Sequence, residues 1–75
     1  MNKLSPGQLI KEARHALGYS VNDMAEALRV GNRLYRRWED DNPSCPISGP
    51  AIVALAGILR EAGRDKLSSK ILEIR

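Results

Sequence analysis

Apolar residues recur along this chain at the three- and four-residue spacing of α-helices, and no stretch shows the alternation of a half-buried strand. Ser5 and Gln8 frame Pro6 as a capping box, so the first helix is predicted to begin there. Gly18 suits the left-handed residue that ends a helix. A second, shorter helix is predicted to follow a cap at Ser20.

A third helix is predicted over residues 32–39, where Tyr35 and Trp38 lie three residues apart and therefore share one face. Residues 40–46 are predicted to form a loop, because they contain two prolines and the residue before each proline avoids the helical conformation. The aromatic pair is expected to point into the core.

Two more helices are predicted in the C-terminal third of the chain. Ser48 is expected to start the first of them and Gly63 to end it, and Asp65 is expected to cap the second. The whole pattern predicts one all-α domain, residues 1–75, built from four to five short helices.

The composition of the chain excludes several classes of function. With one cysteine and one histidine in 75 residues, neither a disulfide nor a metal site is expected, and no other cofactor is indicated. No nucleophile–base arrangement or phosphate-binding loop occurs, so an enzyme with a small-molecule substrate is not expected. No apolar run approaches the ~18 residues of a membrane span. A cytoplasmic location without a membrane partner is therefore predicted.

The distribution of charge points to nucleic acid. Four arginines occur between positions 29 and 37 with no acidic residue among them, although the net charge of the chain is only +3. The second and third helices are joined by a short connection that carries glycine, which allows the third helix to protrude into a DNA major groove. Its outward positions, predicted to contact base edges, are Asn32, Arg33, Arg36 and Arg37.

Residues 24–39 resemble the Cro and phage-repressor (XRE) helix-turn-helix family. The resemblance is carried by the Met24-Ala25 pair, by Leu28 and Val30 around the turn, and by the Trp38-Glu39 ending. It implies a lambda-repressor-like domain with its helix-turn-helix at about 20–39 and C-terminal helices at about 49–74 for the core and dimerisation.

The same resemblance implies roles for individual residues. Its base-reading positions fall on Asn32, Arg33 and Arg37, with Arg36 reaching base or backbone. It also implies a structural ion pair between Arg14 and Glu39. The DNA backbone contacts are assigned to Ser20, Val21, Asn22 and Leu34.

Three features depart from the family pattern. Arg29 stands where the family usually has glycine, and Gly31 replaces the usual serine or threonine cap. Asp40 and Asp41 stand where relatives often carry phosphate-binding basic residues. The two aspartates are predicted to form a solvated loop and to preclude a tight backbone clamp there.

The last two helices contain more apolar residues than one helix can bury inside a small monomer. Either both helices cover the core, or part of their apolar surface forms a twofold interface. The interface is favoured, because two recognition helices about 34 Å apart would contact successive turns of a palindrome. The residues assigned to this interface are Val53, Ile58, Leu67, Ile71, Leu72 and Ile74.

The sequence therefore predicts a homodimeric DNA-binding transcriptional regulator, most simply a repressor that occupies an inverted repeat in a promoter. The start of the fourth helix, Ser48-Gly49-Pro50-Ala51, resembles small phage-type regulators, including those encoded beside anti-CRISPR genes. The alternative is an antitoxin or adaptor whose main partner is another protein, bound by the apolar C-terminal helices.

Overall fold

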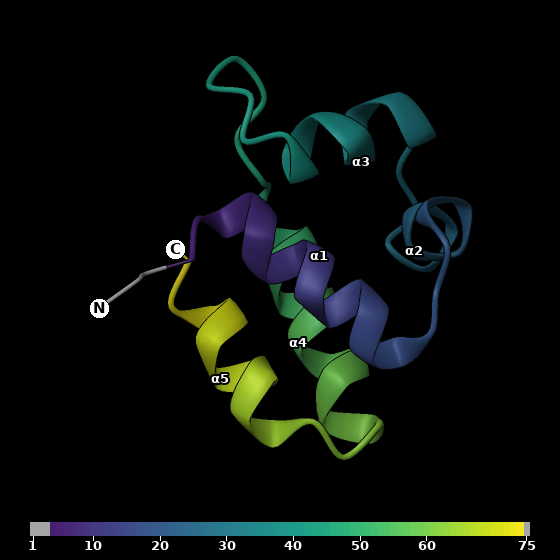
Figure 1. Cartoon of the computed structure of the whole chain (residues 1–75), viewed down its shortest axis with the longest axis vertical. Coiled ribbons are helices and arrows are strands. Elements are labelled where there is room, and N and C mark those ends of the chain that lie inside the picture. The colour runs from purple at the N-terminus through teal and green to yellow at the C-terminus, as the bar shows by residue number, and fades with distance from the viewer. Residues whose placement is uncertain (1–3, 75) are drawn as a thin grey trace.

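The computed structural model describes residues 4–74, which form five α-helices and contain no β-strand (Figure 1). The predicted all-α fold is confirmed for this range. None of these helices is long and apolar enough to cross a membrane. The helices are α1 (Pro6–Leu17), α2 (Val21–Ala27), α3 (Asn32–Glu39), α4 (Gly49–Glu61) and α5 (Asp65–Leu72).

Three serines begin helices where the sequence predicts them. Ser5 and Ser20 each form a complete capping box, and the Ser48 hydroxyl accepts a hydrogen bond from the N–H of Ala51 at 3.3 Å. Gly18 ends α1 in the left-handed conformation with φ of 72°. These local hydrogen bonds satisfy donors that the first turn of a helix leaves unpaired.

The start of α5 differs from the prediction. Asp65 is the first residue inside the helix, and the cap position belongs to Arg64, which makes no side-chain cap hydrogen bond. The Asp65 carboxylate still lies in the first helical turn, where a negative charge interacts favourably with the helix dipole.

One hydrophobic core receives side chains from all five helices. Ile10, Met24, Tyr35, Leu59 and Ile71, one from each helix, are at most 2% exposed. Because α2 and α3 are too short to be stable alone, this shared burial holds them in place. The other buried apolar side chains are Ala13, Ala25, Trp38, Ala51, Ile52, Leu55 and Ala56.

α5 runs back along α4 as the second arm of a helical hairpin (Figure 1). The buried hydroxyl of Ser68 donates a hydrogen bond of 2.9 Å to the carbonyl oxygen of Ala56 in the middle of α4. This bond fixes the register between the two helices without leaving a buried polar group unpaired.

The predicted dimer interface needs a correction. Ile71 is 0% exposed in the core of the monomer, so its assignment to an interface is wrong. The apolar side of α5 covers the core, because this helix folds back onto α4. Of the six assigned residues only Val53 is exposed, and the half-buried ones are Ile58, Leu67, Leu72 and Ile74.

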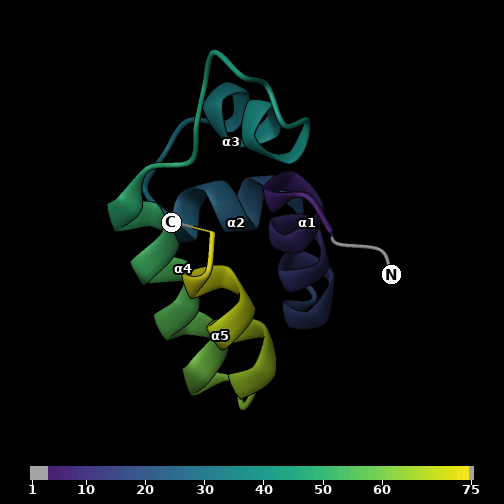
Figure 2. The same cartoon turned by 90° about the vertical axis from the view of Figure 1, so that its left-hand side faces the viewer.

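Helix α3 lies at one end of the molecule, with α1 and α2 beneath it (Figures 1 and 2). α3 lies across the view in Figure 1 while α2 is seen end-on, so the two helices cross steeply. α4 begins near the end that carries α3 and runs away from it, along the edge of the molecule in Figure 2. One side of α3 is therefore left uncovered by the rest of the fold.

Candidate nucleic-acid interface

Two aromatic side chains fix the inner face of α3. Tyr35 and Trp38 are both buried, and their rings meet edge to face with centroids 6.3 Å apart and planes inclined by 71°. The helix packs through this side against α1 and α2. The predicted inward orientation of the aromatic pair is confirmed, and it determines which residues of α3 face outward.

The outer face of α3 carries the residues assigned to base contacts. Asn32, Arg33, Arg36 and Arg37 are all exposed, and Leu34 beside them is 36% exposed. Among residues 4–74 no carboxylate forms an ion pair with any of these arginines. Their positive charges are therefore not neutralised within the described part of the protein.

A side-chain hydrogen bond joins the beginnings of α2 and α3. The amide nitrogen of Asn32 donates to the side-chain oxygen of Asn22. This bond spans the turn and holds the first residue of α3 beside the start of α2. The Asn32 amide keeps its oxygen and its second N–H, the pair of groups that a bidentate contact with adenine requires.

The turn between α2 and α3 contains a strained residue. Arg29 has a φ of 59°, the left-handed conformation that glycine adopts freely and that costs other residues about 1–2 kcal/mol. Gly31 follows as the cap of α3, with extended backbone angles and no side-chain cap hydrogen bond. The two positions that the sequence singled out in this turn are therefore a left-handed arginine and a helix start without a side-chain cap.

The start of α2 is partly occupied by its own cap. The Ser20 hydroxyl accepts from the N–H of Asp23, and the Asp23 carboxylate accepts from the N–H of Ser20, both at 3.1 Å. The N–H groups of Val21 and Asn22 have no intrahelical partner at this position in a helix. The Asp23 carboxylate lies beside them and opposes the approach of a phosphate.

The ion pair between Arg14 and Glu39 is present. The Nε atom of Arg14 lies 2.7 Å from Oε2 of Glu39, and another guanidinium nitrogen donates to the carbonyl oxygen of Tyr19 at 3.2 Å. The two charged side chains are only 12% and 11% exposed. They tie the middle of α1 to the last residue of α3.

This arrangement changes three pKa values. The hydrogen bond to Glu39 raises the pKa of Arg14, although burial acts in the opposite direction. For Glu39, burial acts to raise the pKa, but the hydrogen bond from Arg14 and neighbouring charges outweigh it and lower the pKa. Burial, followed by the nearby Glu39 carboxylate, raises the pKa of the Tyr35 hydroxyl.

Asp41 is exposed in the loop after α3, as predicted, and its carboxylate also bonds to the start of α1. Its carboxylate accepts hydrogen bonds from the Ser5 hydroxyl at 2.5 Å and from the N–H of Gly7 at 2.7 Å. The negative charge therefore lies at the N-terminus of α1, where the helix dipole favours it. Asp41 has a φ of 56°, which aspartate tolerates better than most residues.

Gly7 allows α1 and α3 to approach closely. A Cβ atom at this position would lie 2.5 Å from the carbonyl oxygen of Glu39 and 2.7 Å from that of Trp38. Only a residue without a side chain fits there. Gly7 and Asp41 thus hold the start of α1 against the end of α3, and they determine how closely these two helices pack.

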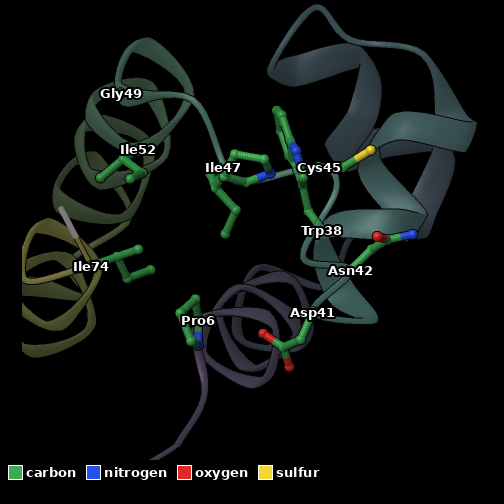
Figure 3. Close-up of a pocket in the computed structure, with 10 residues that line it drawn as sticks. Pro6, Trp38, Asp41, Asn42, Cys45, Ile47, Gly49, Ile52 and Ile74 are labelled. Atoms are coloured by element: carbon green, nitrogen blue, oxygen red, sulfur yellow. The ribbon is translucent and has the colours of Figure 1, made fainter.

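A pocket of about 570 Å³ lies beside the C-terminal end of α3 (Figure 3). Trp38 and Ile52 contribute its buried part, and Arg37 reaches its rim through a 3.8 Å contact between its guanidinium and the Cys45 sulfur. The sequence contains no signal for this pocket, because its walls come from segments far apart in the chain. The lining residues are Pro6, Trp38, Asp41, Asn42, Cys45, Pro46, Ile47, Gly49, Ile52 and Ile74.

Comparison with protein-family models, with curated proteins and with solved structures finds no match to this chain. Within residues 4–74, no three His, Cys, Asp or Glu side chains are grouped in a way that could hold a metal ion. The function of this protein is therefore inferred from its sequence and from the geometry of α3.

Proposed function

We propose that this protein is a sequence-specific regulator of transcription that binds double-stranded DNA, with α3 as the helix that enters the major groove. One observation carries the proposal. A short helix at one end of the molecule exposes Asn32, Arg33, Arg36 and Arg37 together, while Tyr35 and Trp38 hold its other side in the core. Arginine pairs with guanine and asparagine with adenine in this groove.

The outward residues of α3 would contribute differently to the selectivity and to the affinity of DNA binding. Asn32 and Arg33 lie in the first turn of α3, the part of a recognition helix that reaches base edges most readily. Arg36 and Arg37 lie in its last turn and contact bases or phosphates there. Arginines that meet phosphate supply affinity that falls steeply with salt, without any sequence preference.

The proposed mode of action is repression by a homodimer that occupies an inverted repeat in a promoter. A single module of this size buries little DNA surface, so two copies on one operator would provide the affinity and selectivity that one lacks. The Cro and phage-repressor resemblance supports the same mode of action. The proposed place of action is the nucleoid, in the cytoplasm.

The test is selection from a pool of randomised double-stranded DNA at about 50 and about 200 mM salt, followed by sequencing of the retained fraction. The proposal predicts recovery of an inverted repeat with half-sites about one helical turn apart. Retention without enrichment, lost at the higher salt, would mean that the arginines contact phosphate only. No retention at either salt would favour the antitoxin or adaptor alternative.

A further inference from the structure

The pocket beside the C-terminal end of α3 has the size and the character of a small-molecule site. Its volume of about 570 Å³ falls within the range of roughly 300–1,000 Å³ that is typical of ligand pockets. Most of its wall is apolar, and Figure 3 shows Ile47, Ile52 and Ile74 gathered on one side of Trp38. An apolar molecule that fits this pocket would be stabilised by the burial of its surface.

One wall of the pocket carries a buried donor without a partner. Trp38 is 3% exposed, and its indole N–H has no hydrogen-bond partner among residues 4–74. A buried donor that stays unpaired is costly, and native proteins rarely keep one without a reason. Because the indole nitrogen can only donate, the group that would satisfy it must be an acceptor. The DNA contacts proposed for α3 do not use this N–H.

The other polar groups of the lining indicate which acceptor fits. Both oxygens of the Asp41 carboxylate accept hydrogen bonds, from Ser5 and from Gly7, and the negative charge opposes an anionic ligand. The side-chain oxygen of Asn42 accepts from the N–H of Ser44 at 2.9 Å, which leaves its amide N–H groups as donors. The pocket therefore offers apolar surface and donors to an uncharged molecule that carries an acceptor oxygen.

Residues 43–47 form the wall that can admit such a molecule. The N–H of Trp38 is shielded from solvent, so an acceptor reaches it only when part of the wall shifts. Within residues 4–74, no backbone hydrogen bond joins this segment to a helix, and its one side-chain contact with a helix is that of Cys45 with Arg37. A loop held by few hydrogen bonds opens at little cost in free energy.

We infer that this pocket (the Trp38 pocket) binds a small, uncharged, largely apolar molecule whose carbonyl or ether oxygen accepts a hydrogen bond from the indole N–H of Trp38. The isoleucines of the lining contact the apolar body of the ligand. The indole N–H orients the oxygen and provides selectivity, because an analogue without that oxygen leaves the donor unpaired.

A ligand in the Trp38 pocket also acts on DNA binding, a step that rests on the proposed function. Residues 40–48 project beyond the C-terminal end of α3, at the end of the molecule that carries this helix (Figures 1 and 2). Because the core lies on the inner side of this loop, the loop opens outward, toward the DNA, and separates Cys45 from Arg37. The bound ligand therefore weakens DNA binding, and DNA weakens ligand binding by the same factor.

The first test uses 1-tetralone and tetralin as probes, because they share one fused ring system and differ by a single carbonyl oxygen. Trp38 is the only tryptophan, so one indole resonance in the ¹H–¹⁵N correlation spectrum reports on the pocket. 1-Tetralone is expected to shift this resonance saturably and to move the indole proton to lower field, and tetralin is expected to cause no such downfield move. The absence of a saturable shift with 1-tetralone would overturn the inference.

The second test separates the N–H from the aromatic ring. Trp38→Phe keeps an aromatic side chain and removes the donor. The preference for 1-tetralone, taken as the ratio of the two dissociation constants, is expected to fall about 3- to 10-fold. Isoleucine methyl resonances follow the binding in this variant, since Ile47, Ile52 and Ile74 line the pocket. An unchanged ratio would refute recognition of the oxygen by Trp38.

A third measurement holds even if Trp38→Phe fails to fold. Ile74→Ser removes apolar wall from the pocket and is expected to weaken the binding of both probes about fivefold. Ile58→Ser is the matched control, because Ile58 is also half-buried but lies outside the lining, and it should leave both affinities unchanged. Equal effects of the two variants would contradict binding in the Trp38 pocket.

The link to DNA is tested separately. Saturating 1-tetralone is expected to weaken binding to the recovered DNA site by about fivefold or more. Unchanged DNA affinity, together with a saturable shift of the Trp38 resonance, would overturn the link to α3 alone. A protein that binds 1-tetralone but retains no DNA would contradict the proposed function and support the Trp38 pocket.

Discussion

Arg14 on α1 and Glu39 at the end of α3 form an ion pair in which 2.7 Å separates Nε from Oε2, and each side chain is about nine-tenths buried. This pair crosses from the first helix to the helix that carries the candidate DNA-binding residues. Removing one partner leaves the other charge buried without compensation, which is far more costly than losing an exposed pair.

Glu39→Gln is therefore expected to lower the free energy of unfolding by about 2–3 kcal/mol. Glu12→Gln is the matched control, because it removes the same charge from an exposed position on α1. It is expected to change stability by less than about 0.5 kcal/mol. Urea-induced unfolding followed by circular dichroism measures both, and equal effects would contradict a stabilising role for the pair.

The stability of the protein should depend on pH through Glu39. The pKa of Glu39 in the folded state lies below its ordinary value of 4.5. The stabilisation is therefore complete above that ordinary value and is lost as the pH falls through the lower folded pKa. Unfolding in urea at a series of pH values should show a steeper acid loss for wild type than for Glu39→Gln. Parallel profiles would refute the assignment.

Gly7→Ala is expected to destabilise the protein by about 1–3 kcal/mol. The new methyl group would meet the carbonyl oxygens of Trp38 and Glu39, which are backbone atoms and cannot move without shifting α3. Gly31→Ser is the control, because that glycine has extended angles and open space around it. Serine is at least as good a cap as glycine, so this variant should keep or slightly gain stability in thermal unfolding.

Arg29→Gly is expected to stabilise the protein by about 1 kcal/mol, because glycine adopts the φ of 59° without strain. Arg29→Ala removes the same charge but keeps the strained conformation, so it should not produce that gain. Thermal unfolding of the two variants separates backbone strain from charge. Equal stability of the two would show that the turn is not strained.

Arg37→Ala tests the role of α3 in selecting sequence. Loss of a bidentate base contact is expected to cost about 1–3 kcal/mol of binding and to relax the preference at one base pair of the recovered site. Lys66→Ala, at an exposed position on α5, removes the same charge from the opposite part of the molecule and should leave the preference intact. A uniform loss on all sequences would make Arg37 a phosphate contact.

Much of the fold was predictable because its signals are local. The caps at Ser5, Ser20 and Ser48 bond to backbone groups three residues away, so a short stretch of sequence contains the whole interaction. The spacing of Tyr35 and Trp38 likewise determined which side of α3 faces the core. The exposed positions of Asn32, Arg33, Arg36 and Arg37 follow directly from that spacing.

Contacts between distant segments were not predictable. Asp41 is exposed in a loop as predicted, but nothing in the sequence indicated its hydrogen bonds to the start of α1, 34 to 36 residues earlier in the chain. Ile71 was assigned to an interface, although it lies in the core because α5 folds back on α4. Periodicity shows that a helix has an apolar side, but it does not show what covers that side.

The sequence by itself determined the four to five short helices, most of their ends and the outward face of α3, because helix formation depends on hydrogen bonds and side-chain spacing within a few residues. Only the tertiary structure decided how Gly7 and Asp41 dock α1 against α3, which apolar residues remain exposed on α4, and where the pocket beside Trp38 lies. Those features arise from close packing between segments far apart in the chain, and the local sequence around a residue does not determine which distant residues it contacts.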